Sequence, residues 1–140
     1  MGEARALLEQ NLASWNNHDS AGWVGDFSPD AELAAPGISG SGTEMVNMFY
    51  SLWQDAFPDN QVRVVAMLED GDTAVLQGVF EGTHTEVLNA PDQPIPATGR
   101  RVSIPFVTLN TFGAGKLTNF ALYFDRVELL SQLDVMPTQA

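Results

Sequence analysis

The sequence predicts an α+β domain in which three helices pack on one face of a mostly antiparallel sheet. Up to residue 57 the apolar residues recur mainly at helical spacing, and from residue 61 they alternate with a period of two. Helices followed by a run of strands are typical of folds that segregate the helices on one side of a sheet. The 140 residues, 44% hydrophobic and 17% charged, fit one globular domain over 1–140. We expect the sheet to be strongly curved and to enclose a pocket with the helices.

An amphipathic first helix and a short second helix are predicted. Leu8, Leu12 and Trp15 share one helical face, and the polar run NNHD ends this helix. Asp19 is placed to cap a second helix that contains Trp23, and the SP pair that follows stops it.

A brief strand and a glycine-rich loop are expected before the third helix. Ser41 and Glu44 have the spacing of a capping box that opens it. Met48, Phe49 and Trp53 contribute to its broad apolar face, and the FPD run ends it.

The second half of the chain is predicted to form two hairpins. The loop between them, residues 87–99, carries three prolines, and Pro105 indicates a bulge or an edge position in the strand that follows. The strands are expected over 61–68, 73–85, 101–112 and 117–124.

Charge and composition exclude several classes of function. Six Lys and Arg against eighteen Asp and Glu give a net charge of −12, which repels nucleic acid and anionic membranes. The chain contains no cysteine, no basic and apolar leader, and no apolar run of the ~20 residues that a membrane span requires. We expect a cytoplasmic protein that binds no nucleic acid and no membrane.

Asp125 is the leading candidate for a catalytic residue. It follows the aromatic run of the last strand, and alternation places it on the same side as Asn119 and Tyr123. A carboxyl group held dry among aromatic rings can exchange protons near neutral pH. The alternative is structural, because Asp125 and Glu128 also form a capping pattern ahead of a leucine-rich helix.

His84 is the second candidate. Alternation puts it with two glycines, which could leave room for a ligand against the imidazole, and a histidine can transfer protons at cellular pH. The alternative is a partly buried polar residue at the end of a strand. Trp15, Met48, Phe49 and Trp53 are expected to belong to the core and to wall a pocket for a flat apolar molecule.

No metal or cofactor site is expected. His18 and His84 are far apart in the sequence and the carboxylates are scattered, whereas a zinc site needs at least three protein ligands. The GSG run follows no βαβ pattern, and the serines lack a nucleophile elbow.

Several stretches, taken together and in order, resemble the SnoaL-like polyketide cyclases of the nuclear transport factor 2-like superfamily. The resemblance covers nearly the whole chain. It is carried by ASWNNHD (13–19), FPD (57–59), FEGTHT (80–85), PATGR (96–100), GKL (115–117), YFD (123–125) and LSQL (130–133).

This resemblance implies a cone-shaped fold and a cofactor-independent aldol ring closure of an aromatic polyketide ester, with Asp125 moving the proton. Three positions depart from the pattern. Asn110 lies in the region where the cyclases carry an assisting histidine, Ala121 replaces an aromatic residue, and Glu86 replaces a glycine. Asn110 is therefore counted among the substrate-binding candidates with Asn119 and Tyr123, and His84 is the candidate to replace the missing histidine.

Other functions on this fold stay open. Ala35 before Pro36 lacks the base of a ketosteroid isomerase, and Arg100 with Asp125 is only a remnant of an epoxide hydrolase site. A hydroxylase and a non-catalytic small-molecule binding domain are the remaining alternatives. A homodimer is expected, because the outer face of the sheet is rich in apolar residues.

Overall fold

The computed structural model, which describes residues 2–90 and 93–135, has a layer of helices packed on a curved mixed sheet. The helical layer consists of α1 (Glu3–Asn16), α2 (Ser20–Gly25) and α3 (Thr43–Ala56). The sheet has the spatial order β2-β1-β8-β7-β4-β3, and only β1 and β8 are parallel. Its strands are β1 (Phe27–Ala35), β2 (Ile38–Ser41), β3 (Gln61–Asp70), β4 (Thr73–Thr83), β7 (Arg101–Gly113) and β8 (Lys116–Phe124). The predicted α+β class is confirmed.

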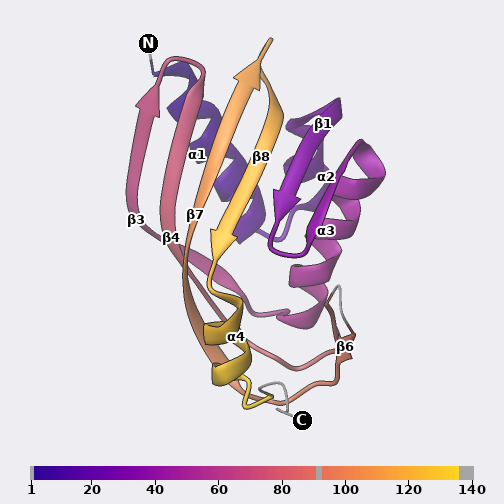
Figure 1. Ribbon diagram of the computed structural model, residues 1–140. Helices are drawn as coiled ribbons and strands as arrows, with labels where there is room; N and C mark the ends of the chain where they lie inside the picture. The colour runs from indigo at the N-terminus through magenta and orange to yellow at the C-terminus, as the bar shows by residue number, and fades with distance from the viewer. Residues whose placement is uncertain (1, 91–92, 136–140) are drawn as a thin grey trace.

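Two smaller features complete the described part of the chain. The short pair β5 (Leu88–Asn89) and β6 (Pro94–Ile95) lies in the proline-rich segment that was expected to be a loop. Helix α4 (Arg126–Gln132) lies beyond the end of β8, at the opposite end of the sheet from the N-terminus (Figure 1).

The helices begin and end close to the predicted positions, with one exception. Leu8 and Trp15 are buried along α1, and the Asp19 side chain accepts the Gly22 N–H at 3.0 Å to cap α2. The capping box expected for α3 is wrong. Ser41 pairs with Glu32 as the last residue of β2, so Gly42 is the N-cap and no side chain caps the helix. The backbone at Gly42 has φ +97°, a conformation that favours glycine.

The edge position expected at Pro105 is confirmed. Pro105 pairs with Val79 on one side, but β8 ends at Phe124 opposite Phe106, so no strand of the described residues lies on the other side of β7 here. The amide side chain of Gln132 replaces that strand at Ser103: it accepts the Ser103 N–H at 2.7 Å and donates to the Ser103 carbonyl at 2.9 Å. These two bonds hold α4 against the free edge of β7.

A buried polar network joins the helices to the start of the sheet. Asn60 is fully buried, and its oxygen accepts the Trp15 indole N–H at 2.9 Å. Its side-chain nitrogen donates to Gln54 Oε1 and to the Phe57 carbonyl, both at 2.8 Å. Gln54 in turn donates to the Trp15 carbonyl at 3.1 Å. The backbone of Asn60 lies so close to Gly82 that a Cβ there would come within 3.2 Å of it.

The outer face of the sheet carries an apolar row across four strands. The ladder pairs Leu68 with Val75, Val75 with Leu109, and Leu109 with Ala121. Leu68 is 66% exposed and Tyr123, on the same face, is 61% exposed. This row, from Leu68 to Ala121, is the surface that we expect a second copy of the chain to cover.

We therefore expect this protein to sediment as a dimer at micromolar concentration, and Leu109→Lys to shift it to the monomer of 15.2 kDa. Because each chain carries a net charge of −12, added salt should strengthen the dimer by screening repulsion. Sedimentation velocity measures both effects. A wild-type monomer at every salt concentration would contradict this prediction.

Candidate functional site

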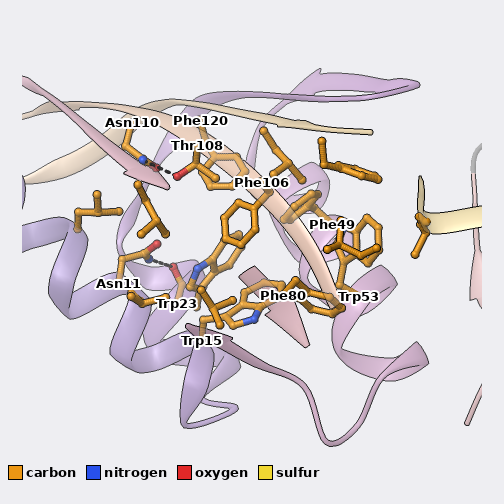
Figure 2. Close-up of a pocket in the computed structure, with 18 residues that line it drawn as sticks. Asn11, Trp15, Trp23, Phe49, Trp53, Phe80, Phe106, Thr108, Asn110 and Phe120 are labelled. Atoms are coloured by element: carbon orange, nitrogen blue, oxygen red, sulfur yellow. Dashed lines mark hydrogen bonds between the residues drawn. The ribbon is translucent and has the colours of Figure 1, made fainter. Parts of the chain in front are cut away.

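A pocket lies between the helices and the inner face of the sheet. It is lined from α1, α2, α3 and α4 on one side and from β3, β4, β7 and β8 on the other, and its volume is about 90 Å³ (Figure 2). Eight aromatic side chains supply much of the lining: Trp15, Trp23, Phe49, Trp53, Phe80, Phe106, Phe120 and Phe124.

The aromatic rings of the lining pack against one another in an edge-on and stacked arrangement. The Phe49 ring centre lies 5.9 Å from that of Trp23 and 5.4 Å from that of Phe120. Trp53 lies 5.6 Å from Phe80 and 5.5 Å from Phe124. Such contacts hold the rings in place, so the walls present flat apolar surfaces.

Three polar side chains, Asn11, Thr108 and Asn110, also line the pocket. Asn11 donates to the Trp23 carbonyl at 3.3 Å and to Asp26 at 3.1 Å. Asn110 donates to the Ala74 carbonyl at 3.2 Å and to the Thr108 hydroxyl at 2.9 Å. Among the described residues that line the pocket, none carries an ionisable side chain.

Tyr50 is an ionisable residue that packs against two aromatic residues of the lining, Trp15 and Trp23. Its ring lies 5.3 Å from Trp15, but it is not part of the pocket lining. Burial raises the pKa of the Tyr50 phenol, and Asp19 and Asp55 raise it further, so this side chain stays neutral at neutral pH.

Asp125 does not lie in the pocket. It is exposed, and it is the N-cap of α4: its carboxylate accepts the N–H groups of Val127 at 2.9 Å and Glu128 at 3.2 Å. The expectation of a carboxyl group kept dry among aromatic rings is therefore wrong, and the predicted helix cap is confirmed.

The other residues expected on the side of Asp125 also point away from the pocket. Asn119 and Tyr123 are exposed, whereas Phe120, Leu122 and Phe124 line the pocket from the same strand. The two sides of β8 were assigned the wrong way round. Burying two phenylalanines and a leucine stabilises the fold by about 1.5–3 kcal/mol each, more than burying a tyrosine hydroxyl and a carboxylate would.

Of the candidate residues on the helices, some line the pocket and one does not. Trp15, Phe49 and Trp53 line the pocket, together with Asn110 of β7. Met48 lies on the exposed side of α3, is 51% exposed, and lines a separate hollow instead.

His84 is fully buried but lies outside the pocket. Its ring packs 5.3 Å from that of Phe57, and its Nδ1 accepts the Thr98 N–H at 3.3 Å and lies 3.0 Å from the Thr98 hydroxyl. Because Nδ1 accepts a backbone N–H, the proton of the neutral ring is on Nε2, which has no hydrogen-bond partner among the described residues. The space expected beside Gly82 is filled by Phe57 and Asn60. His84 holds together the segments before and after β5 and β6.

Burial lowers the pKa of His84 below its ordinary value, and this makes stability depend on pH. In the unfolded chain the pKa is about 6.5, so the unfolded state binds more protons below that pH. The free energy of unfolding should therefore decrease as the pH falls below about 6.5, and it should be constant above that pH. Urea unfolding between about pH 5 and pH 8 measures this slope.

His84→Gln should flatten the slope. Equal slopes for the wild type and His84→Gln would contradict the assignment.

Two polar residues of the lining, Asn11 and Thr108, were not among the predicted site residues, although a signal for each was present. Asn11 lies three residues after Leu8 and four before Trp15, on the same helical face. Thr108 lies two residues before Asn110, on the same side of β7.

The described residues offer no ready metal site, since they contain no group of three or more His, Asp or Glu side chains placed to bind one ion. Nor does this part of the chain include a helix with the length and apolar character to cross a membrane.

The chain is similar to known proteins over nearly its whole length. The family model described as SnoaL-like polyketide cyclase matches residues 5–133. The crystal structure of AclR, a putative hydroxylase from Streptomyces galilaeus, shares 28% identity over 98% of this chain and 99% of its own, with a TM-score of 0.82. IdmH, a putative polyketide cyclase from Streptomyces antibioticus, shares 21% identity over 94% of this chain and 99% of its own, with a TM-score of 0.77.

A third structure, a putative SnoaL-like polyketide cyclase from Jannaschia sp. CCS1, shares 21% identity over 94% of this chain and 93% of its own, with a TM-score of 0.78. No curated protein sequence matches the chain.

Proposed function

This chain belongs to the SnoaL-like polyketide cyclase family, and from that premise we propose that its pocket binds a flat, largely apolar, polyketide-derived molecule. The observation that carries this proposal is the lining: fifteen of its eighteen residues are aromatic or aliphatic, and the three polar ones are uncharged. A neutral aromatic molecule enters such a site at little cost in desolvation, whereas an ion would lose its hydration without gaining a counter-charge.

The volume of the pocket sets a condition on the ligand. An engineered apolar cavity of roughly 150 Å³ holds a benzene molecule, and this pocket measures only about 90 Å³. A ligand of two or more fused rings therefore requires the lining side chains to move apart. Phe106, which is only partly buried, lies at the centre of the view in Figure 2, and it is the lining side chain that we expect to move.

For the chemistry, the first candidate is the aldol-type ring closure for which the family is named, without a cofactor. In this reaction a proton leaves an acidic carbon, that carbon bonds to a carbonyl carbon, and the carbonyl oxygen ends as a hydroxyl. A protein group that carries the proton typically contributes 10²- to 10⁴-fold in rate, on the order of three to five kcal/mol. Asp125 is the candidate for this group, since it directly follows Phe124 of the lining; to act on a bound ligand, its carboxylate has to leave the Val127 and Glu128 N–H groups and turn toward the pocket.

The second candidate is binding without turnover. It is favoured by one specific observation, the lack of an ionisable side chain among the described residues of the lining. A hydroxylation of the bound molecule, as the name of AclR suggests for that protein, would also use the pocket mainly to hold a ring in place.

The binding proposal is tested with tetralin, an uncharged bicyclic hydrocarbon. We expect calorimetric titration to detect tetralin binding to the wild type, and Leu122→Trp to abolish it, because the larger side chain fills a pocket of about 90 Å³. Leu109→Trp makes the same change on the outer face of the sheet, where the residue is 42% exposed, and should bind tetralin as the wild type does. Equal affinities for all three proteins would refute the proposal.

A further inference from the structure

Two residues that line the pocket each have one buried polar atom without a hydrogen-bond partner among the described residues: Nε1 of Trp53 and Oδ1 of Asn110. The indole nitrogen is a donor only, and the amide oxygen is an acceptor only. Folded proteins pair nearly all of their buried polar groups, so an unpaired group at a binding site indicates where a ligand atom belongs. The pocket thus offers one donor and one acceptor in apolar surroundings.

The orientation of the Asn110 amide is fixed by its neighbours. Its nitrogen donates to the Ala74 carbonyl at 3.2 Å, and a carbonyl oxygen can only accept. A flipped amide would set two acceptors against each other, so the unpaired atom is the oxygen. Asn110 is also fully buried, which prevents bulk water from pairing that oxygen.

Thr108 adds a hydroxyl group at the same end of the pocket. Its oxygen accepts the second N–H of Asn110 at 2.9 Å, so its own O–H is available to donate (Figure 2). A ligand hydroxyl at this end could donate to Asn110 Oδ1 and accept from Thr108 at once. A ligand carbonyl could use only Thr108. This end therefore favours a hydroxyl group.

Trp53 lies at the other end of the strands that line the pocket. Its ring contacts Phe124 and Phe80, whose ladder partners are Phe106 and Ile104. Asn110 is four to six residues further along β7, roughly 13–20 Å at about 3.3 Å per residue. Figure 2 shows the two side chains on opposite sides of the pocket, with aromatic rings between them.

We infer that the pocket selects a hydroxylated aromatic ketone, with its carbonyl oxygen on the Trp53 indole N–H and its hydroxyl group between Asn110 and Thr108. This inference rests on the proposed binding function and names the class of its ligand. With a hydrogen bond of about 2.9 Å at each end, the two ligand oxygens are roughly 7–14 Å apart. That spacing corresponds to a molecule of two or more fused rings with oxygens at opposite ends.

Four bicyclic compounds of nearly the same shape test this inference by calorimetric titration. Hydroxytetralone, with its hydroxyl on the ring remote from the ketone, carries both groups. Tetralone carries only the carbonyl, tetrahydronaphthol only the hydroxyl, and tetralin neither. We expect hydroxytetralone to bind the wild type about tenfold more tightly than either compound with one group, since each of its two oxygen groups forms a hydrogen bond with a buried polar atom that otherwise has none.

Three variants show which protein group binds which ligand group. Trp53→Phe keeps an aromatic ring and removes the N–H, so hydroxytetralone and tetrahydronaphthol should bind it equally. Thr108→Val and Asn110→Leu should remove the preference for the hydroxyl, and Thr108→Val keeps a side chain of similar shape in case Asn110→Leu does not fold.

Equal binding of all four compounds to the wild type, or equal weakening of all four by a variant, would overturn the inference and leave the apolar pocket standing. Absence of binding by any compound, tetralin included, would refute the proposed function and the inference with it.

Discussion

Replacing Asn60 with alanine is expected to lower the free energy of unfolding by about 3 kcal/mol or more, the largest effect on stability that we predict. The substitution leaves the Trp15 N–H and the Gln54 side-chain oxygen without their partner in a fully buried site, whereas the Phe57 carbonyl keeps the backbone N–H of residue 60. Each unpaired buried group costs about 1–3 kcal/mol. Urea unfolding followed by circular dichroism measures the change.

Asn17→Ala is the matched control for Asn60→Ala. Asn17 lies at the surface after α1, and its side chain makes no hydrogen bond within the described part of the chain, so its loss should change stability by less than about 0.5 kcal/mol. If both variants unfolded at the same urea concentration, the hydrogen bonds of Asn60 would contribute no more to the free energy of unfolding than a surface side chain does.

Replacing Asp125 with asparagine is expected to give the largest effect on activity if the protein closes rings. Turnover of an aromatic polyketide ester should fall roughly 100-fold or more, the usual contribution of a general acid or base. Tetralin binding should stay within about twofold of the wild type, because the carboxylate is not part of the lining. Product formation and calorimetric titration on the same samples separate the two effects.

A third measurement isolates the structural role of Asp125. Asparagine is as good an N-cap as aspartate, so Asp125→Asn should keep the stability of α4, whereas Asp125→Ala should lose about 1 kcal/mol. If Asp125→Asn turned over substrate at the wild-type rate, Asp125 would have no part in proton transfer and only its helix cap would remain.

The fold was predictable because its signals are local. The change from helical spacing to alternation at residue 61, the caps at Asp19 and Asp125, and the edge position of Pro105 can all be recognised from short windows of sequence. The box at Ser41 and Glu44 failed because Ser41 is instead paired with Glu32 of β1, a contact between strands that a local motif does not contain.

The site was predictable only in part, because a strand has two sides and alternation does not say which is buried. On β8 both sides carry an aromatic residue. The side with Phe120, Leu122 and Phe124 faces the helices, because burying these three side chains removes the larger apolar surface from water. Asn110 was recognised through its place in the family pattern. Its role as an unpaired acceptor depends on Ala74, which is 36 residues away and visible only in three dimensions.

The parallel pairing of β1 with β8 has a consequence for how the chain reaches this structure. Phe27 and Leu117 lie side by side although ninety residues separate them, and closing a loop of that length costs about 4 kcal/mol in chain entropy before any contact repays it. During synthesis β1 can have only β2 beside it until nearly the whole chain has left the ribosome. In that interval the edge of β1 is unpaired and could pair with another chain, so we expect chaperones to bind the nascent protein at this edge.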